Sequence, residues 1–187
     1  MHSLIITAHP NAQGFTHQIA GKYQKVREEA GHTVQILNLY APENRQEFLT
    51  YKDQKELSAR GQQLNAIQKE IQKADELVFI FPVWWYDVPA ILKNFLDMNF
   101  APGFAFSYSS RGIKGLFTGK TMRFFSTAAA PALIYRLGFL PYVPSFRKSL
   151  KDCGIRLSSK TIFGSRRGPN GTQEKKWLED VRVLAAI

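Results

Sequence analysis

The chain has 187 residues, 44% hydrophobic and 21% charged, which is typical of one globular domain and too balanced for a disordered, collagen-like or disulfide-rich protein. A single cysteine, Cys153, excludes an intrachain disulfide, so we expect a reducing, cytoplasmic environment. The formal net charge of +10 attracts anions such as nucleic acid, acidic lipid headgroups or a phosphorylated cofactor.

The first part of the chain alternates between strand and helix patterns. Residues 3–7 are an apolar run typical of a buried parallel strand, and residues 16–30 carry apolar side chains at helical spacing. Residues 33–38 alternate in polarity, which predicts a second strand. Residues 40–52 are polar and without period, which indicates a loop, and residues 53–74 are predicted to form one long helix.

The middle of the chain contains the strongest strand signal. Residues 77–81 (LVFIF) are apolar on both faces, which predicts the central strand, and a loop follows over residues 82–87. We expect a helix to open at Pro89, with Asp87 placed either to cap its positive end or to favour that end by its charge. Residues 100–119 are rich in glycine and aromatic residues and show no clear period.

The last third contains two further strands, residues 121–126 and 156–163, and two further helices, residues 146–153 and 173–185. Residues 124–146 carry one charged residue, Arg136, but three prolines interrupt them, and a charge at mid-bilayer costs about 2.5–3.5 kcal/mol. We therefore expect a strand end and a buried loop here, and no stable membrane insertion.

Five strands alternating with helices predict a single α/β domain over residues 1–187, with an open parallel sheet covered on both faces. In such sheets ligands bind outside the carboxyl ends of the strands, where the winding direction switches. Three loops leave strand ends near that point, over residues 9–15, 82–87 and 127–135. These loops are the predicted functional site.

The first loop, AHPNAQGFT, leads from a strand into a helix, so backbone N–H groups and the helix dipole favour an anion there. His9 and Thr16 can add hydrogen bonds to a phosphate. The glycine patterns of a dinucleotide-binding turn and of a P-loop are absent. A plain strand–helix turn with a satisfied histidine is the alternative.

The second loop places Trp84, Trp85 and Tyr86 side by side. The backbone amides of residues 83–86 can bind the edge of a ring, and an aromatic face can stack on it. Packing of these side chains into the core is the alternative. The third loop, STAAAPALIY, offers two hydroxyls and small residues that let a planar ligand approach the backbone, and a generic tight loop is equally compatible with it.

Other binding classes have weaker support. Basic residues are frequent in the last third, but no zinc-finger spacing, RNA-recognition signature or heptad zipper accompanies them, so we expect no nucleic-acid partner. Dispersed surface charges explain the excess equally well. His2, His17 and His32 show no ligand spacing with one another, so no metal site is predicted.

The motifs together resemble one protein family. The chain reads AHPN-x-x-x-F at residues 8–15, F-P-x-x-W-x-x-x-P-A-x-L-K at 81–93 and GFAFSY at 103–108, and it ends with FG…W-L-E-x-V. This combination covers nearly the whole chain and resembles the flavodoxin-like NAD(P)H:quinone oxidoreductases. That family includes quinone reductases, general-stress NAD(P)H oxidoreductases and the ancillary subunit of glutathione-gated potassium efflux systems.

The resemblance implies a three-layer α/β/α sandwich with the flavodoxin-like strand order 2-1-3-4-5. It also implies a homodimeric flavoenzyme that takes a hydride from NAD(P)H onto flavin N5 and then reduces a quinone-like small acceptor, by a ping-pong mechanism. FMN is the expected cofactor, because relatives that use FAD carry an insertion after the second strand and the loop here is short. FAD is the alternative cofactor, and NADH and NADPH both remain open.

The resemblance also implies which residues hold the flavin. His9, Phe15 and Thr16 would hold its ribityl-phosphate arm. The residues that would line the isoalloxazine ring are consecutive: Pro82, Val83, Trp84, Trp85 and Tyr86. The residues that would meet its pyrimidine edge are Ser126, Thr127 and Ala128.

The substrate would meet residues from elsewhere in the chain. Phe106 and Tyr108 match aromatic positions that cover flavin and substrate in relatives, often from the partner subunit. Tyr135 matches the tyrosine of a tyrosine–histidine pair that assists charge transfer, so Tyr135 and Tyr108 are the catalytic candidates. No histidine follows Tyr135, and this departure puts efficient quinone reduction in question. A flavin-binding regulatory subunit of a membrane transport system, with secondary oxidoreductase activity, is therefore the alternative function.

Two loops also depart from the family pattern. Relatives commonly have serine at Gly14 and asparagine at Thr16, and glycines where this chain has Ala128 and Ala129. Alanine in the left-handed region costs about 1–2 kcal/mol. The third loop is therefore expected either to take another shape or to accept strain.

Overall fold

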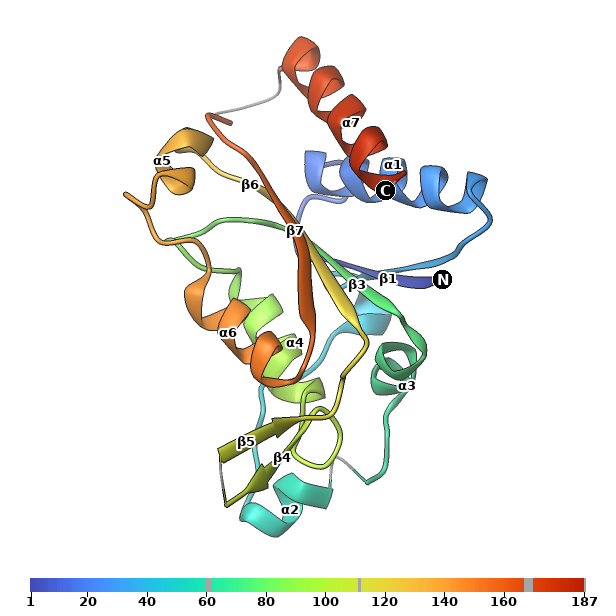
Figure 1. Cartoon of the computed structure of the whole chain (residues 1–187), viewed down its shortest axis with the longest axis vertical. Coiled ribbons are helices and arrows are strands. Elements are labelled where there is room, and N and C mark those ends of the chain that lie inside the picture. Colours follow the sequence, from blue (N-terminus) through green and yellow to red (C-terminus); the bar gives the residue numbers. More distant parts are fainter. Residues whose placement is uncertain (60–61, 111, 167–169, 187) are drawn as a thin grey trace.

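A twisted five-stranded parallel sheet forms the centre of the molecule (Figure 1). The computed structural model describes residues 1–59, 62–110, 112–166 and 170–186. The strands, in spatial order, are β2 (Thr33–Asn38), β1 (His2–Thr7), β3 (Glu76–Pro82), β6 (Thr121–Thr127) and β7 (Arg156–Phe163). This order is 2-1-3-4-5 when the strands of the sheet are counted along the chain, so the predicted fold class is confirmed.

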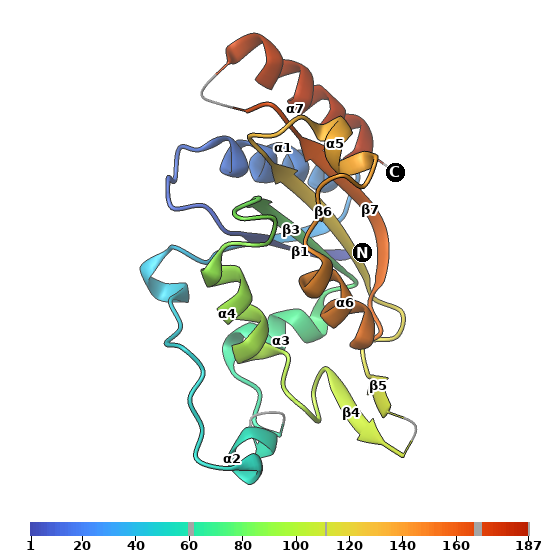
Figure 2. The same cartoon turned by 90° about the vertical axis from the view of Figure 1, so that its left-hand side faces the viewer.

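Helices cover both faces of the sheet (Figures 1 and 2). On one face, α1 (Phe15–Glu29) and α7 (Gly171–Ala185) lie together and bury a core cluster that includes Ile19 and Val181. On the other face, α3 (Ala66–Lys73), α4 (Ala90–Asn99) and α6 (Pro144–Asp152) pack over a larger aromatic core. Both faces of β3 are therefore buried, as its apolar sequence predicts.

The prediction of one helix over residues 53–74 is wrong. The chain instead forms α2 (Gln54–Ala59) and then α3. Asn65 has an extended backbone and begins α3 with a capping box, in which its side chain accepts from the N–H of Gln68 and Gln68 accepts from the N–H of Asn65. This cap satisfies the free N–H groups of a new helix, so it favours a fresh start over continuation.

Smaller elements also differ from the predictions. The predicted loop of residues 40–52 contains the 3-10 turn η1 (Pro42–Asn44), and the third loop contains the short helix α5 (Ala132–Arg136). The N-cap of α4 is Pro89, and Asp87 accepts from the adjacent N–H of Val88 instead of capping the helix. Of the two roles expected for Asp87, capping is therefore wrong, and an electrostatic effect on the positive helix end stays a prediction.

A second, two-stranded sheet occupies part of the region without clear period. Strands β4 (Phe106–Ser109) and β5 (Gly112–Gly115) pair antiparallel. The end of β5 lies against the turn between α6 and β7, because a Cβ on Gly115 would be 2.3 Å from the backbone nitrogen of Gly154. The hairpin therefore projects from the edge of the main sheet where its strands begin (Figure 2).

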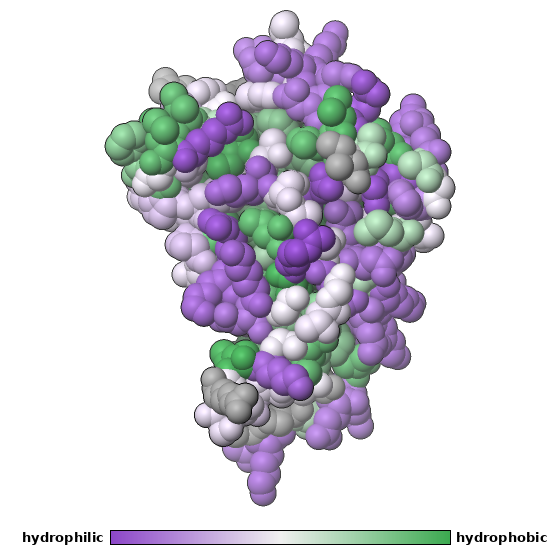
Figure 3. Space-filling model, viewed as in Figure 1, coloured by the Kyte–Doolittle hydropathy of each residue, from purple (hydrophilic) through white to green (hydrophobic). Residues whose placement is uncertain are grey.

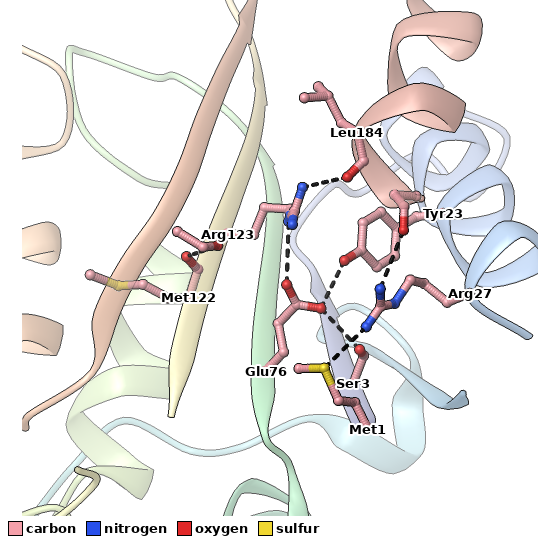
Figure 4. Close-up of polar contacts among 10 residues, drawn as sticks. Met1, Ser3, Tyr23, Arg27, Glu76, Met122, Arg123 and Leu184 are labelled. Carbon is pink, nitrogen blue, oxygen red and sulfur yellow. Dashed lines mark hydrogen bonds and ion pairs between the residues drawn. The ribbon is translucent and has the colours of Figure 1, made fainter. Parts of the chain in front are cut away.

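A buried polar cluster ties the sheet to the α1–α7 layer (Figure 4). Glu76 accepts from the hydroxyls of Ser3 (3.0 Å) and Tyr23 (2.7 Å) and pairs with Arg123 (3.3 Å). Arg27 donates to the carbonyl of Ala185 at the end of α7. The carboxylate is thus compensated and hydrogen-bonded, as a buried charge needs to be.

No helix within the described residues combines the length and apolar character needed to cross a membrane. Residues 124–146, which carry one charged residue, Arg136, include the end of β6, the helix α5 and the start of α6.

Candidate functional site

The three predicted loops meet at the carboxyl edge of the sheet. The N–H of Val83 donates to the carbonyl of Thr127 across 2.8 Å, which joins the second loop to the third. The N–H of Val143 donates to the carbonyl of Tyr86 across 3.2 Å, so the chain beyond α5 also contacts the second loop. Thr127 lines a cavity together with His9 of the first loop.

This cavity has a volume of about 180 Å³ and lies at the start of α1. Hydrogen bonds within the first loop shape it: the N–H of Gly14 donates to the carbonyl of Asn11, and the N–H of Gln13 donates to its side-chain oxygen. The lining is mostly polar. It consists of His9, Asn11, Gly14, Phe15, Thr16, Thr127 and Arg166.

The amino end of α1 faces this cavity with free donors. Gly14 is the N-cap and provides no side-chain cap. The N–H groups of Phe15 and Thr16 are in the first turn, where no preceding carbonyl is available, and the helix dipole makes this end positive. The Phe15 ring is buried against Phe163 and Trp177. A ligand in the cavity can therefore bind the backbone N–H of Phe15, and both the backbone N–H and the side-chain hydroxyl of Thr16.

His9 presents a neutral imidazole. Its Nδ1 lies 3.1 Å from the backbone nitrogen of Asn11 and 3.3 Å from the carbonyl oxygen of the same residue. In the neutral tautomer in which Nδ1 accepts from the N–H of Asn11, the proton is on Nε2. Burial lowers the pKa of His9 below the ordinary 6.5. A hydrogen bond to the backbone of Asn11 raises this pKa in part, and the positive charges of His17 and Arg166 lower it further. At neutral pH the ring therefore donates one hydrogen bond without carrying a charge.

Arg166 was not among the predicted site residues. In the sequence it belongs to a run of basic residues with no local motif. In the structure its guanidinium lies 5.4 Å from the centre of the Phe15 ring and pairs with Glu174 of α7 at 2.6 Å. It therefore adds a permanent positive charge to the wall of the cavity.

The second loop is a tight two-residue turn that exposes its aromatic side chains. Trp84 and Asp87 exchange two backbone hydrogen bonds of 3.0 Å, and Trp85 and Tyr86 between them have φ values of 50° and 67°. Such positive φ values cost about 1–2 kcal/mol per non-glycine residue, and strain of this kind is typical of functional sites. Trp85 is 92% exposed, so it lies at the rim and does not pack into the core.

Fewer backbone donors are free in this turn than the sequence suggested. Of the amides of residues 83–86, that of Val83 donates to Thr127 and that of Trp84 donates to Asp87. The amides of Trp85 and Tyr86 donate to no carbonyl among the described residues, so they remain for the edge of a ring. Pro82 ends β3 and is buried.

The third loop takes a conformation in which its alanines avoid the left-handed region of backbone conformation. Among the described residues, positive φ values outside glycine occur at Trp85, Tyr86, Val143 and Ser165, so Ala128 and Ala129 are unstrained. The N–H of Ala128 donates to the carbonyl of Phe163. Of the three residues expected at a pyrimidine edge, Thr127 alone lines the described cavity.

Ser126 is buried and engaged elsewhere. Its Oγ lies 3.0 Å from the hydroxyl of Tyr142 and 3.5 Å from the carbonyl of Thr161. Tyr142 was not predicted, because nothing local in the sequence distinguishes it. Its ring packs edge-on to Tyr135 with centres 6.2 Å apart. Burial, with a smaller effect of Tyr86, raises the pKa of Tyr135, so this phenol stays protonated at neutral pH.

Phe106 and Tyr108 lie far from these loops. Both are in β4, within the hairpin at the opposite edge of the sheet from the cavity (Figure 1). Tyr108 is 72% exposed. Within one chain, the structure does not bring them together with the other predicted site residues.

The chain matches a known family over residues 1–182, and that family is described as having the flavodoxin-like fold. The chain belongs to this family. The resemblance inferred from the loop motifs is confirmed, and the strand order agrees with it.

Two curated relatives illustrate the similarity. A Haemophilus influenzae protein named as an uncharacterized NAD(P)H oxidoreductase is 34% identical over 131 residues, which cover 68% of this chain and 64% of that protein. The FMN-dependent NADH:quinone oxidoreductase 1 of Bacillus subtilis is 30% identical over 148 residues, 74% of this chain and 66% of that protein. The aligned region thus spans slightly less than two thirds of both relatives.

A solved structure is similar over the whole length. The crystal structure of Smu.1420 from Streptococcus mutans has a TM-score of 0.83 and 28% identity, covering 100% of this chain and 99% of that one.

Proposed function

We propose that the protein is an FMN-dependent NAD(P)H oxidoreductase that reduces a quinone or a similar small acceptor. One observation carries this proposal: a polar cavity at the positive end of α1 adjoins an exposed, strained aromatic turn, and Thr127 contacts both. An anionic group and a planar aromatic group, connected to each other, match these two features. The names of the Haemophilus and Bacillus relatives support the same activity.

The residues present fit a flavin mononucleotide. The cavity offers the N–H groups of Phe15 and Thr16, a donor on His9 and the guanidinium of Arg166, whose buried Nε has no partner among the described residues. These are donors without acceptors, which suits a phosphate. The aromatic turn offers an indole face and two free amides for a ring with hydrogen-bonding edges.

The chain's own groups would bind and orient the cofactor. His9, Thr16 and the start of α1 would hold the phosphate, and the amides of Trp85 and Tyr86 would bind the ring edge. A flavin held there supplies two-electron transfer from NAD(P)H to the acceptor in alternate half-reactions. Tyr135 would donate a hydrogen bond or proton at its hydroxyl, because its raised pKa keeps it protonated.

A homodimer would complete the site. Tyr108 and Phe106 are at the opposite edge from the loops, so they can cover the site of a second copy but not their own. Exposed apolar side chains lie at the loop end of the sheet and at the hairpin end. The first group, around α5, is Leu133, Leu137 and Phe139, and the second, on the hairpin, is Tyr108 and Ile113. Figure 3 shows apolar atoms gathered at the upper left, over α5. Exposed patches of this kind are typical of protein contacts.

Subunit complementation tests this arrangement. A His9→Glu chain has a carboxylate in the cavity that repels a phosphate, and a Tyr108→Ala chain lacks the covering ring, so each homodimer is expected to be inactive. A mixed dimer would hold one complete site and regain up to about half of the activity per dimer. No recovery in mixed dimers would contradict the shared site.

A regulatory subunit of a transport system is the second candidate function. Its support is the missing histidine: the ring packed on Tyr135 is another tyrosine, Tyr142. Slow turnover with all quinones tested, together with co-purification of a membrane protein, would favour this function.

Steady-state kinetics test the main proposal. The purified, FMN-loaded protein is assayed with NADH or NADPH and a soluble quinone, both varied. If the nicotinamide and the acceptor react in turn at one binding site, plots of reciprocal rate against reciprocal nicotinamide concentration at different quinone concentrations are expected to be parallel. Absence of oxidation of either nicotinamide with every acceptor would overturn the enzymatic function.

A further inference from the structure

We propose that Arg166 makes the site select a phosphorylated flavin over its unphosphorylated form. Arg166 lies in the segment that follows β7, and Glu174 holds its side chain in position. This inference rests on the proposed flavin site. It adds to that site a residue that comes from none of the three strand-end loops.

The backbone beyond β7 is built to deliver Arg166. The N–H of Ser165 donates to the carbonyl of Ala130, and the N–H of Arg166 donates to the carbonyl of Ala128, both at 3.0 Å. A Cβ on Gly164 would be 2.2 Å from the backbone nitrogen of Ala132. Glycine is therefore required for the close approach that brings Arg166 to the cavity.

The side chain of Arg166 is fixed on two sides. Its guanidinium lies over the buried Phe15 ring, and its Nη2 donates to Oε1 of Glu174. Both side chains of this pair are mostly buried, with 23% and 13% of their surfaces exposed. Glu174 uses one of the five N–H donors of the guanidinium, and the buried Nε has no partner among the described residues.

Glu174 is itself on a fixed helix. It lies in the first turn of α7, and Trp177 one turn later packs on Phe15 and Phe163. The far end of α7 is held by Arg123, which donates to the carbonyl of Leu184 at 2.6 Å (Figure 4). Glu174 is thus a positioning residue that acts through Arg166.

The charge in the cavity comes from Arg166. Of the seven described residues that line the cavity, it is the one that is always charged, since His9 is neutral at neutral pH. A phosphate gains a charge-assisted hydrogen bond from it, whereas riboflavin has no group to place there. Removal of Arg166 is therefore expected to weaken FMN binding and to leave riboflavin binding unchanged.

Titration of the apoprotein with FMN and with riboflavin, followed by quenching of flavin fluorescence, tests this. Arg166→Gln is expected to weaken FMN about 10- to 100-fold and to change riboflavin less than about twofold. Arg166→Lys keeps the charge without the planar fork, so its loss of FMN affinity is expected to be smaller. Glu174→Ala is expected to weaken FMN alone, and Glu174→Gln, which keeps the hydrogen bond, to restore most of the affinity.

Arg182→Gln is the matched control, because it removes the same charge from α7 in an exposed pair with Glu179. Unchanged FMN affinity in this control, with a loss in the Arg166 variants, supports a local contact over the general field of a chain with a net charge of +10. Equal losses of FMN and riboflavin, or no loss in either Arg166 variant, overturn this inference while the flavin site stands. If the unmodified protein binds neither flavin, the proposed function fails as well.

Discussion

The N–H of Val83 donates to the carbonyl of Thr127 across 2.8 Å, and this bond joins the exposed aromatic turn to the wall of the polar cavity. Thr127 also lines that cavity. One residue at the end of β6 therefore fixes the relative position of the two parts of the site.

Gly14→Ala is expected to weaken FMN binding about tenfold, equivalent to about 1.4 kcal/mol. A Cβ at this position would be 2.9 Å from both Nδ1 of His9 and the carbonyl oxygen of Asn11. The first loop must then shift, and His9 moves out of place. Fluorescence titration with FMN measures the change.

Gly21→Ala is the control for this substitution. Gly21 is inside α1 and has no neighbouring atom within 4 Å of an added Cβ. Alanine there is expected to stabilise the helix by about 0.5–1 kcal/mol and to leave FMN affinity unchanged. Equal FMN affinity in both variants would show that the position of His9 does not matter.

Tyr142→Phe is expected to lower the free energy of unfolding by about 1–2 kcal/mol. Tyr142 is 5% exposed, and its hydroxyl satisfies the buried Oγ of Ser126, whose other contact is longer at 3.5 Å. Urea unfolding measures the difference. Tyr51→Phe, at a half-exposed position, is the comparison and is expected to cost less than about 0.5 kcal/mol. Equal stability of the two variants would contradict the role of this pair.

His9 is expected to titrate below pH 6.5 in the free protein, because burial and nearby positive charge lower its pKa. The unfolded chain therefore takes up this proton first as the pH falls below 6.5. Any contribution of His9 to stability is unchanged above that pH and is lost as the pH falls through the folded-state pKa.

Inorganic phosphate in the cavity is expected to raise the pKa of His9, since an adjacent anion stabilises the charged ring. Proton NMR of the ring, with and without phosphate, measures both values. A titration at or above pH 6.5 without phosphate, or no upward shift on its addition, would count against the cavity as an anion site.

Glu76→Gln is expected to lower the free energy of unfolding by about 3–5 kcal/mol, because it leaves the buried Arg123 without a counter-charge. Glu179→Gln breaks an exposed pair with Arg182 and is expected to cost less than about 1 kcal/mol. Thermal or urea unfolding compares the two. A small effect at Glu76 would mean that the cluster in Figure 4 is not important for stability.

Much of the fold could be predicted from local pattern. The five strands of the main sheet are apolar or alternating runs, and their predicted bounds differ from the observed ones by one residue at most at either end. The break between α2 and α3 depends on the capping box of Asn65 and Gln68. It was not predicted, because the helical spacing of apolar residues continues across this position. The β4–β5 hairpin is four residues per strand and largely exposed, so it leaves no strong apolar pattern.

The site could be predicted in part. Its three loops follow from the position of the strand ends, and the cavity contains His9 and Thr16 as expected. Arg166 and Tyr142 could not be identified, because their roles depend on contacts with Glu174 and Ser126. Folding creates these contacts, and no local sequence pattern marks them. The sequence also does not show which backbone amides of residues 83–86 bond within the protein and which are free for a ligand, because this depends on the conformation of the folded turn.

The most direct test of the central claim is a titration of the purified apoprotein with FMN under anaerobic conditions, followed by addition of NADH or NADPH. We predict uptake of one FMN per chain, quenching of flavin fluorescence, and bleaching of the bound flavin's visible absorbance by at least one of the reduced nicotinamides. A protein that takes up no FMN, or whose bound flavin keeps its colour with both nicotinamides, would contradict the account.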